Sequence, residues 1–237
     1  MRANGTDQEA AAVDFQKLKN ARPKNLLKLR LSFARQLEPE PVFEFLSAVE
    51  SQTTQRLKRL SRESRKEAKT FRPGSIQSEI LANYFEDEVA LAKSANELAS
   101  LFAIVALYSQ IEIHTKKMCG ASIPDAKPEA LLRWKDLKAL LLKNGIDLQK
   151  LVQYDEVNQL RCLNNAIKHG DSINAELAET GWGNRGAQLD ADRCRRELRE
   201  FANAGEAYLK DLHKQLAAVL NRLTDVQLEK LLRSKKY

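Results

Sequence analysis

The sequence predicts an all-α protein, and both composition and patterning point to that fold class. Leu, Ala, Lys, Arg and Glu dominate, and only nine glycines and six prolines interrupt the 237 residues. These abundant residue types are the ones that favour helices. Apolar residues recur at helical spacing over long segments, and no segment alternates apolar and polar residues as a half-buried strand does. With 43% hydrophobic residues, we expect a helical bundle around a packed core.

Residues 1–74 are expected to form a basic helical segment that packs beside the bundle or forms an arm. Residues 1–25 are polar, and a short basic amphipathic helix is expected over 26–37. Two prolines then open a helix over about 42–70, which is apolar in its first half and basic in its second. The sequence Arg-Pro-Gly-Ser at 72–75 marks a clear break.

Residues 75–237 are expected to form the bundle itself. The segment from 76 to 118 is helical throughout, and its length of more than 40 residues favours two helices or one kinked helix. Seven of its side chains share a repeating apolar face: Leu91, Leu98, Phe102, Val105, Tyr108, Ile111 and Met118. Further elements are expected over 128–143, 147–153, 154–169, 190–223 and 225–234, with a loop at 179–186.

Charge and cysteine usage restrict the environment and the partner. The net charge of +7 and the pI near 9.3 suit an acidic partner such as nucleic acid. Three widely spaced cysteines are typical of reduced thiols rather than a disulfide framework. The N-terminus has no apolar signal region, and no run of about 18 apolar residues occurs. We therefore expect a cytoplasmic protein with no membrane span.

The most informative residues lie near the end of the predicted helix 154–169. Arg161, Asn165 and His169 repeat every four residues, away from the apolar face of that helix. In the simplest interpretation, Lys168 and His169 complement the helix dipole and Gly170 caps the C-terminus. In the functional interpretation the three side chains line a groove or a partner interface, or they face solvent. His169 then moves a proton, Arg161 holds a phosphate and Asn165 orients the imidazole.

Asn165, Lys168 and His169 resemble the end of the signature of the HEPN domains (higher eukaryotes and prokaryotes nucleotide-binding), which is Arg, four to six residues, then His. Residues 106–112, Ala-Leu-Tyr-Ser-Gln-Ile-Glu, are similar to the aromatic-small-x-x-Glu pattern of that family's leading core helix. The similarity covers about residues 90–223. It implies a HEPN-like up-and-down helical bundle, often dimeric, with an additional N-terminal helical segment. Many members are metal-independent ribonucleases of toxin–antitoxin, abortive-infection and CRISPR systems.

The resemblance implies a catalytic set for cleaving RNA through its own 2′-hydroxyl. His169 would be the general acid or base, Arg161 and Lys168 would stabilise the phosphorane, and Asn165 would position His169 or the phosphate. Arg161, however, precedes His169 by eight residues, and Asn164 stands where the Arg-Asn-x-x-x-His form has Arg. The two groups lie about 12 Å apart along the helix axis. Either a symmetric dimer brings Arg161 to the partner's His169, or the bundle has weakened or lost cleavage.

A second candidate site is the basic run from Arg56 to Arg72, with eight positive and two negative residues. A solvated helix face is the usual outcome of such a run. The alternative is an arm that contacts phosphates and supplies affinity rather than sequence choice. Between Arg56 and Lys69 no aromatic residues are interleaved to stack on bases. The nucleic-acid-binding candidates are Arg56, Lys58, Arg59, Arg62, Arg65, Lys66 and Lys69.

No metal or cofactor site is expected, because no Cys-x-x-Cys or paired-His spacing occurs and His114 and Cys119 stand alone. The favoured function is a nucleic-acid-directed module that binds or cleaves RNA, of toxin or defence type. Its expected partners are RNA, a second copy of the chain, and a cognate antitoxin or other protein. The rival is a catalytically inactive helical module for dimerisation or for holding a partner.

Overall fold

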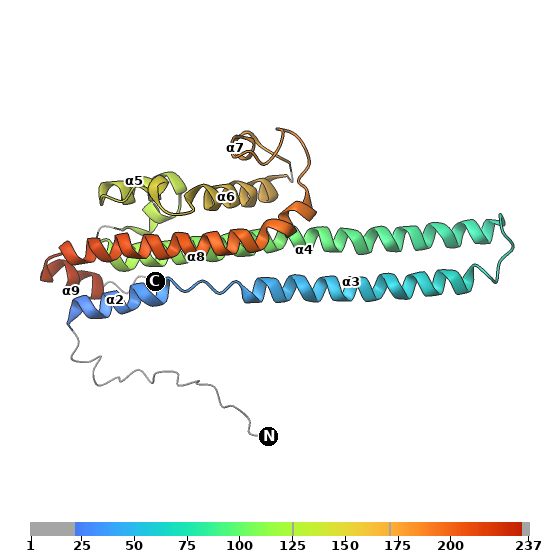
Figure 1. The fold of residues 1–237 in the computed structure, drawn as a ribbon, viewed down its shortest axis with the longest axis horizontal. Coiled ribbons are helices and arrows are strands. Elements are labelled where there is room, and N and C mark those ends of the chain that lie inside the picture. The colour runs from blue at the N-terminus through green and yellow to red at the C-terminus, as the bar shows by residue number, and fades with distance from the viewer. Residues whose placement is uncertain (1–21, 125, 171, 234–237) are drawn as a thin grey trace, which may run out of the picture.

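The computed structural model describes residues 22–124, 126–170 and 172–233. Within these residues the protein is helical throughout, with eight α-helices, and the all-α prediction is confirmed (Figure 1). One isolated antiparallel bridge joins Ser172 and Gln188, and the described residues hold no strand. The prediction of a polar segment over 1–25 falls largely outside the described residues.

The helix boundaries follow the sequence closely. The α-helices are α2 (Pro23–Ala34), α3 (Glu40–Glu67), α4 (Ile76–Ser122), α5 (Trp134–Lys143), α6 (Tyr154–His169), α7 (Ala175–Glu179), α8 (Ala191–Arg222) and α9 (Asp225–Arg233). Two 3₁₀ turns, Pro128–Leu131 and Leu148–Lys150, precede α5 and α6. The bounds of α6 coincide with those predicted, whereas α7 was not predicted.

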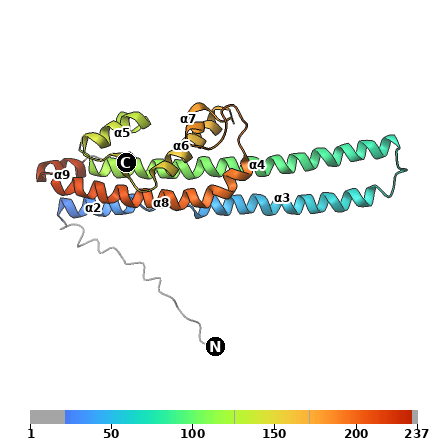
Figure 2. The same ribbon diagram turned by 45° about the horizontal axis from the view of Figure 1, so that its top comes forward.

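Helix α4 runs uninterrupted for 47 residues, so the alternative of two separate helices was wrong. Ser75 caps it, because its side chain accepts a hydrogen bond from the backbone N–H of Ser78 at 3.3 Å. No glycine or proline occurs between Gly74 and Gly120 to end the helix sooner. Tertiary packing supports both halves, since α3 lies along the first half and α8 along the second (Figures 1 and 2).

The body of the protein surrounds the C-terminal half of α4. Helices α2, α6 and α8 pack directly on it, and α9 packs on α2. The core is continuous and mainly aliphatic, with Leu31 of α2, Ile111 of α4, Leu160 of α6 and Leu212 of α8 at 1% exposure or less. Burial of such side chains supplies the main favourable free energy of the bundle.

An antiparallel hairpin projects from the body. Helix α3 and the N-terminal half of α4 lie side by side and extend beyond the other helices (Figures 1 and 2). An ion pair between Arg56 and Glu88, 2.5 Å apart, joins the two helices. We call residues 51–93 the arm. The boundary expected at residue 74 lies in the loop at the tip of the arm. The predicted segments 1–74 and 75–237 therefore each contribute one helix to the arm.

By length and composition alone, α4 is one helix within the described residues that could cross a membrane, whereas we expected none. About a third (33%) of its most apolar window is buried in the protein. Core helices of soluble proteins satisfy the same description, so this finding assigns no membrane.

Candidate functional site

Arg161 of α6 lies inside the protein, with 7% of its surface exposed. Its Nε and Nη2 both donate to Asn158 Oδ1 at 3.1 Å, and its guanidinium forms an ion pair with Glu176 of α7. The guanidinium carbon also lies 5.5 Å from the ring centroid of Trp134, at the start of α5. Arg161 therefore ties α5, α6 and α7 together.

The surroundings of Arg161 stabilise its charged form. Burial alone would lower the pKa of Arg161, but the hydrogen bond and charge of Glu176 outweigh that effect and raise it. The Nη2 atom also lies 3.2 Å from Cys162 Sγ. Burial raises the pKa of the Cys162 thiol to about 11, so the sulfur is protonated at neutral pH. Of the three expected surroundings of Arg161, a groove, a partner interface or solvent, the first and last were wrong, because Trp134 and Glu176 of α7 cover its guanidinium.

His169 has a different environment. It is the last residue of α6, it is exposed, and among the described residues it makes no hydrogen bond or ion pair. Lys168 beside it is exposed as well. Asn165 is half-buried, and its Oδ1 accepts from Asn164 Nδ2 at 3.4 Å rather than orienting the imidazole. The structure does not bring Arg161, Asn165 and His169 into one constellation within the chain.

Two further positions of the predicted motif lie in the core. Asn164 is 2% exposed, and its Oδ1 has no hydrogen-bond partner among the described residues. Tyr108 of α4 is buried near Arg161 and Cys162, and burial is the largest cause of its raised pKa. Glu112, one turn further along α4, pairs with Lys116 at 2.8 Å. Tyr108 and Asn164 are thus closed to a substrate, whereas Glu112 and Lys116 are partly exposed.

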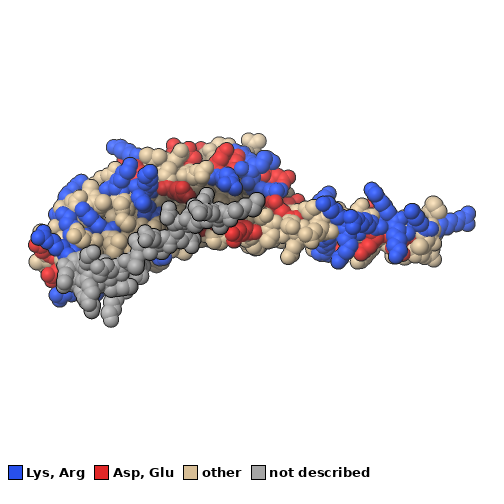
Figure 3. All heavy atoms as spheres, turned by 60° about the horizontal axis from the view of Figure 1, so that its bottom comes forward, with Lys and Arg blue, Asp and Glu red and all other residues tan. Residues whose placement is uncertain are grey.

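The basic run lies on the distal half of α3 and the loop that follows, along the arm (Figure 3). Arg56 pairs with Glu88, and Arg59 lies 3.7 Å from Glu63. The remaining predicted cations are exposed and make no ion pair within the described part of the chain: Lys58, Arg62, Arg65, Lys66 and Lys69. The α3 side of the arm therefore carries a concentrated positive charge, with eight basic and only two acidic residues over 56–72.

Besides an open hollow of about 670 Å³ lined by Arg35, Leu37, Asn203 and Lys210, two others occur on the surface of the described residues. One, of about 400 Å³, is lined by Asp155, Glu156, Asn158, Gln159, Glu179 and Thr180. The other, of about 500 Å³, lies where the start of α8 meets α4 at Ser94, Glu97, Leu98 and Leu101. Within the described ranges, no three His, Cys, Asp or Glu side chains gather in a way that would hold a metal ion. Neither hollow contains a histidine or a cysteine.

One surface feature was not predicted from the sequence, namely a row of exposed apolar side chains on α4. Leu91, Leu98 and Phe102, which were assigned to a shared apolar face with Tyr108 and Ile111, are more than half exposed. The signal was present in the sequence, because α4 is apolar over more of its circumference than one neighbouring helix can cover. We find no protein-family model that matches the chain, and no curated protein or solved structure that is similar to it.

Proposed function

We propose that this chain is a nucleic-acid-binding protein whose arm contacts the phosphate backbone, and that RNA is the nucleic acid bound. The observation that carries the proposal is the set of exposed, unpaired cations at the distal end of α3. The choice of RNA rests on the resemblance to HEPN domains.

The spacing of these cations suits a phosphate backbone. Lys58, Arg62, Arg65 and Lys69 recur at intervals of four, three and four residues, which places them on one side of a helix or its continuation. They span about 16 Å, enough to meet several successive phosphates. Each phosphate neutralised releases bound counterions, which favours binding at low salt without regard to sequence.

We propose that the protein binds RNA without cleaving it, because the contacts of Arg161 on α6 hold it away from a substrate. Arg161 can reach a phosphate, in its own chain or in a partner, only by leaving Glu176, Asn158 and Trp134. Glu176 is 52% exposed, so solvent weakens this ion pair, but Arg161 would also lose both hydrogen bonds to Asn158 and its contact with Trp134. Held in this way, Arg161 does not stand beside His169 to stabilise a phosphorane.

A charge-matched pair of variants tests the proposal. In the arm variant, Arg62, Arg65, Lys66 and Lys69 become Gln. In the control variant, four exposed cations of the body, Arg133, Lys135, Lys143 and Arg185, become Gln, so net charge changes equally. Both are titrated into a fluorescently labelled single-stranded RNA at about 0.1 M salt, and anisotropy gives Kd.

We expect the arm variant to bind at least tenfold more weakly than the wild type, and the control variant to bind within about twofold of it. Equal losses in both variants would show that only net charge matters and would contradict a role for the arm. Absence of RNA binding by the wild type at micromolar concentration would contradict the proposal as a whole.

A further inference from the structure

A row of large apolar side chains lies exposed along α4, from the tip of the arm to the body. Its members are between 51% and 72% exposed: Ile76, Ile80, Tyr84, Leu91, Leu98 and Phe102. A single exposed leucine is ordinary in any protein, but a row of large apolar side chains of this length, interrupted by Asp87, marks an interaction surface. No described residue of the chain covers it.

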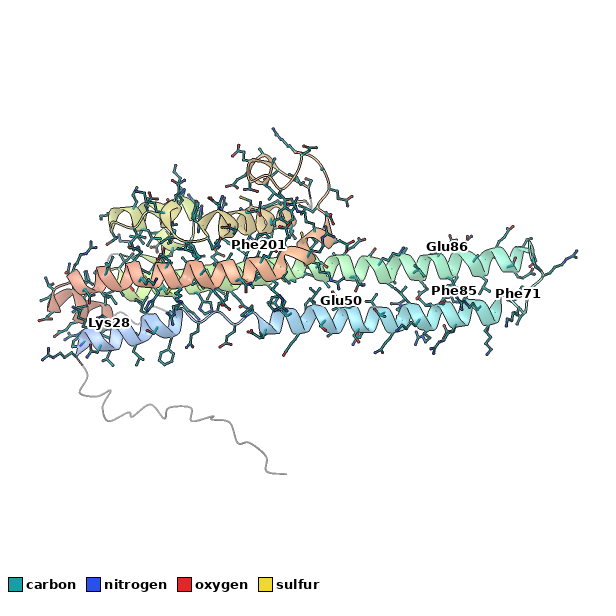
Figure 4. All side chains as sticks on the ribbon, in the orientation of Figure 1. Lys28, Glu50, Phe71, Phe85, Glu86 and Phe201 are labelled. Atoms are coloured by element: carbon teal, nitrogen blue, oxygen red, sulfur yellow. The ribbon has the colours of Figure 1, made fainter. Side chains whose placement is uncertain are left out.

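The row lies beside the contact with α3, not within it. Tyr84, Leu91 and Leu98 each directly precede a less exposed residue, and these residues share one side of α4 at seven-residue intervals: Phe85, which lies between α3 and α4, Ala92 and Ala99. One residue is a rotation of about 100°, so the row faces roughly a quarter turn away from α3. Figure 4 shows the same geometry, with Phe85 between the two helices and Glu86 on the opposite side of α4.

The spacing of the row is that of a helix-packing seam. From Ile80 the row continues at Tyr84, Leu91, Leu98 and Phe102, with intervals of four, seven, seven and four residues. Heptad spacing keeps such side chains in line when two helices pack along their length. A helix, and not a flat or globular surface, is therefore the element that fits the row.

The charges on either side of the row make this face complementary to itself. Glu79, Glu86 and Glu97 border the row on the side away from α3, and Lys93 is the single cation among them. On the α3 side, Arg59 directly precedes the buried Leu60, and Lys66 follows Arg59 at a seven-residue interval that keeps it on the same side of the helix. Because α3 and α4 are antiparallel, residues that come one before the packing positions of α3 lie on the same side of the hairpin as the row on α4. The face thus runs from basic, through apolar, to acidic.

We propose that a second copy of this chain covers the row, with the two arms side by side and their tips at the same end. A two-fold axis parallel to the arm puts the basic α3 border of each copy against the acidic α4 border of the other. The opposite orientation puts like charges together. This dimer does not depend on RNA binding, and it uses α4 rather than the α6 face expected from the sequence.

The size of the face is sufficient for a stable dimer. The row extends for about 39 Å, and two helices side by side present a face about 20 Å wide. This gives about 800 Å² per chain, the size of a standard stable interface. An anionic membrane is a poorer occupant, because four exposed carboxylates lie in or beside the row: Glu79, Glu86, Asp87 and Glu97.

Light scattering coupled to size exclusion tests the dimer. We expect the wild type at tens of micromolar to have twice the 26.9 kDa mass of one chain. Leu91→Glu with Leu98→Glu should give a folded monomer, since both side chains are about half exposed already. The matched control, Leu132→Glu with Leu142→Glu on exposed leucines of the body, should remain dimeric. Circular dichroism checks that all variants keep the wild-type helix content.

Cysteine cross-linking tests the orientation, because the three natural cysteines are buried. Ile80 and Phe102 are about 33 Å apart along the helix, far beyond disulfide reach. With the tips together, Ile80→Cys alone and Phe102→Cys alone each form disulfide dimers on mild oxidation. Cross-links that appear only when the two variants are mixed would overturn the proposed orientation.

Two outcomes overturn the dimer itself. One is a wild-type protein that stays monomeric at tens of micromolar. If that monomer also co-sediments with phosphatidylserine vesicles, the row binds a membrane instead. The other is a dimer that survives Leu91→Glu with Leu98→Glu.

In the proposed dimer each Asp87 faces the partner's Asp87 in the middle of the row, so Asp87→Ala should lower the dimer dissociation constant. No change, or a weaker dimer, would contradict that pairing.

Discussion

At the scale of single residues, Arg161 shows why a helical repeat can mislead. Arg161 and His169 are eight residues apart, so their directions differ by about 80° around the helix axis. That difference is enough for Trp134 and Glu176 to enclose Arg161 while His169 stays exposed. The sequence could identify the polar residues of α6. It could not show which of them the later helix α7 would cover.

Replacing Arg161 by Ala should lower the free energy of unfolding by about 2–4 kcal/mol, because it removes the link between α5, α6 and α7. His169→Ala should leave the urea midpoint unchanged, since His169 is exposed and unpaired in the described structure. Urea denaturation followed by circular dichroism measures both. Equal effects of the two substitutions would contradict the assignment of Arg161 to the interior.

We expect the wild type and His169→Ala to leave labelled RNA equally intact in EDTA, because Arg161, the guanidinium that the resemblance pairs with His169, is held by Glu176 and Asn158. Gel analysis of the RNA after incubation checks this expectation. Cleavage by the wild type that His169→Ala abolishes would restore the ribonuclease interpretation drawn from the resemblance.

The buried thiols give the protein a pH-dependent stability at alkaline pH. Burial raises the pKa of Cys119 and of Cys194 from 9.0 to about 12, and that of Cys162 to about 11. Above pH 9 the unfolded chain therefore loses thiol protons that the folded chain keeps, and stability falls as pH rises towards these values.

We expect the urea midpoint to decrease as the pH is raised from about 9 to 10.5, and to decrease less in Cys119→Ala, which lacks one of these thiols.

In the folded protein at pH 8, a thiol reagent should label the cysteines only after urea is added. Immediate labelling of all three in the native state would show that they are not buried.

At the scale of elements, the close approach of α4 and α8 depends on Gly205. A Cβ atom at this position would lie 2.5 Å from Cδ1 and 3.0 Å from Cγ1 of Ile111, which is itself buried. The crowding costs about 1–3 kcal/mol, more than the gain of about 1 kcal/mol in helix propensity from Gly to Ala.

Gly205→Ala should therefore lower the melting temperature despite its better helix propensity. The control is Asn203→Ala, an exposed position two residues earlier in α8, which should raise it slightly or leave it unchanged. Thermal denaturation of the two variants decides the point. A stabilised Gly205→Ala would mean that the two helices are further apart than described.

Helix positions were the most predictable part of the structure, and helix faces the least. The bounds of α6 follow from its polar start and from Gly170, which has a φ of +139° at the C-terminus. For α4, periodicity indicated an apolar helix but could not choose between two adjacent rows. Ala92 and Ala99 pack inward while Leu91 and Leu98 stay outside, because the neighbouring helix approaches the smaller side chains.

At the scale of the whole molecule, charge and shape act together. The basic run could be read from the sequence, whereas its place on a projecting hairpin could not, because that depends on α3 folding back along α4 (Figures 1 and 3). A positive surface that projects from the body can reach a polyanion without the body obstructing it, and steers its approach.

The most direct test of the account is the salt dependence of RNA binding by the wild type, the arm variant and the body control. If the arm holds the phosphates, the slope of log K against log salt is steep for the wild type and the control. It becomes shallower by up to about 3 units when four arm cations are lost, at about 0.7 per phosphate on single-stranded RNA. An unchanged slope for the arm variant would contradict the account.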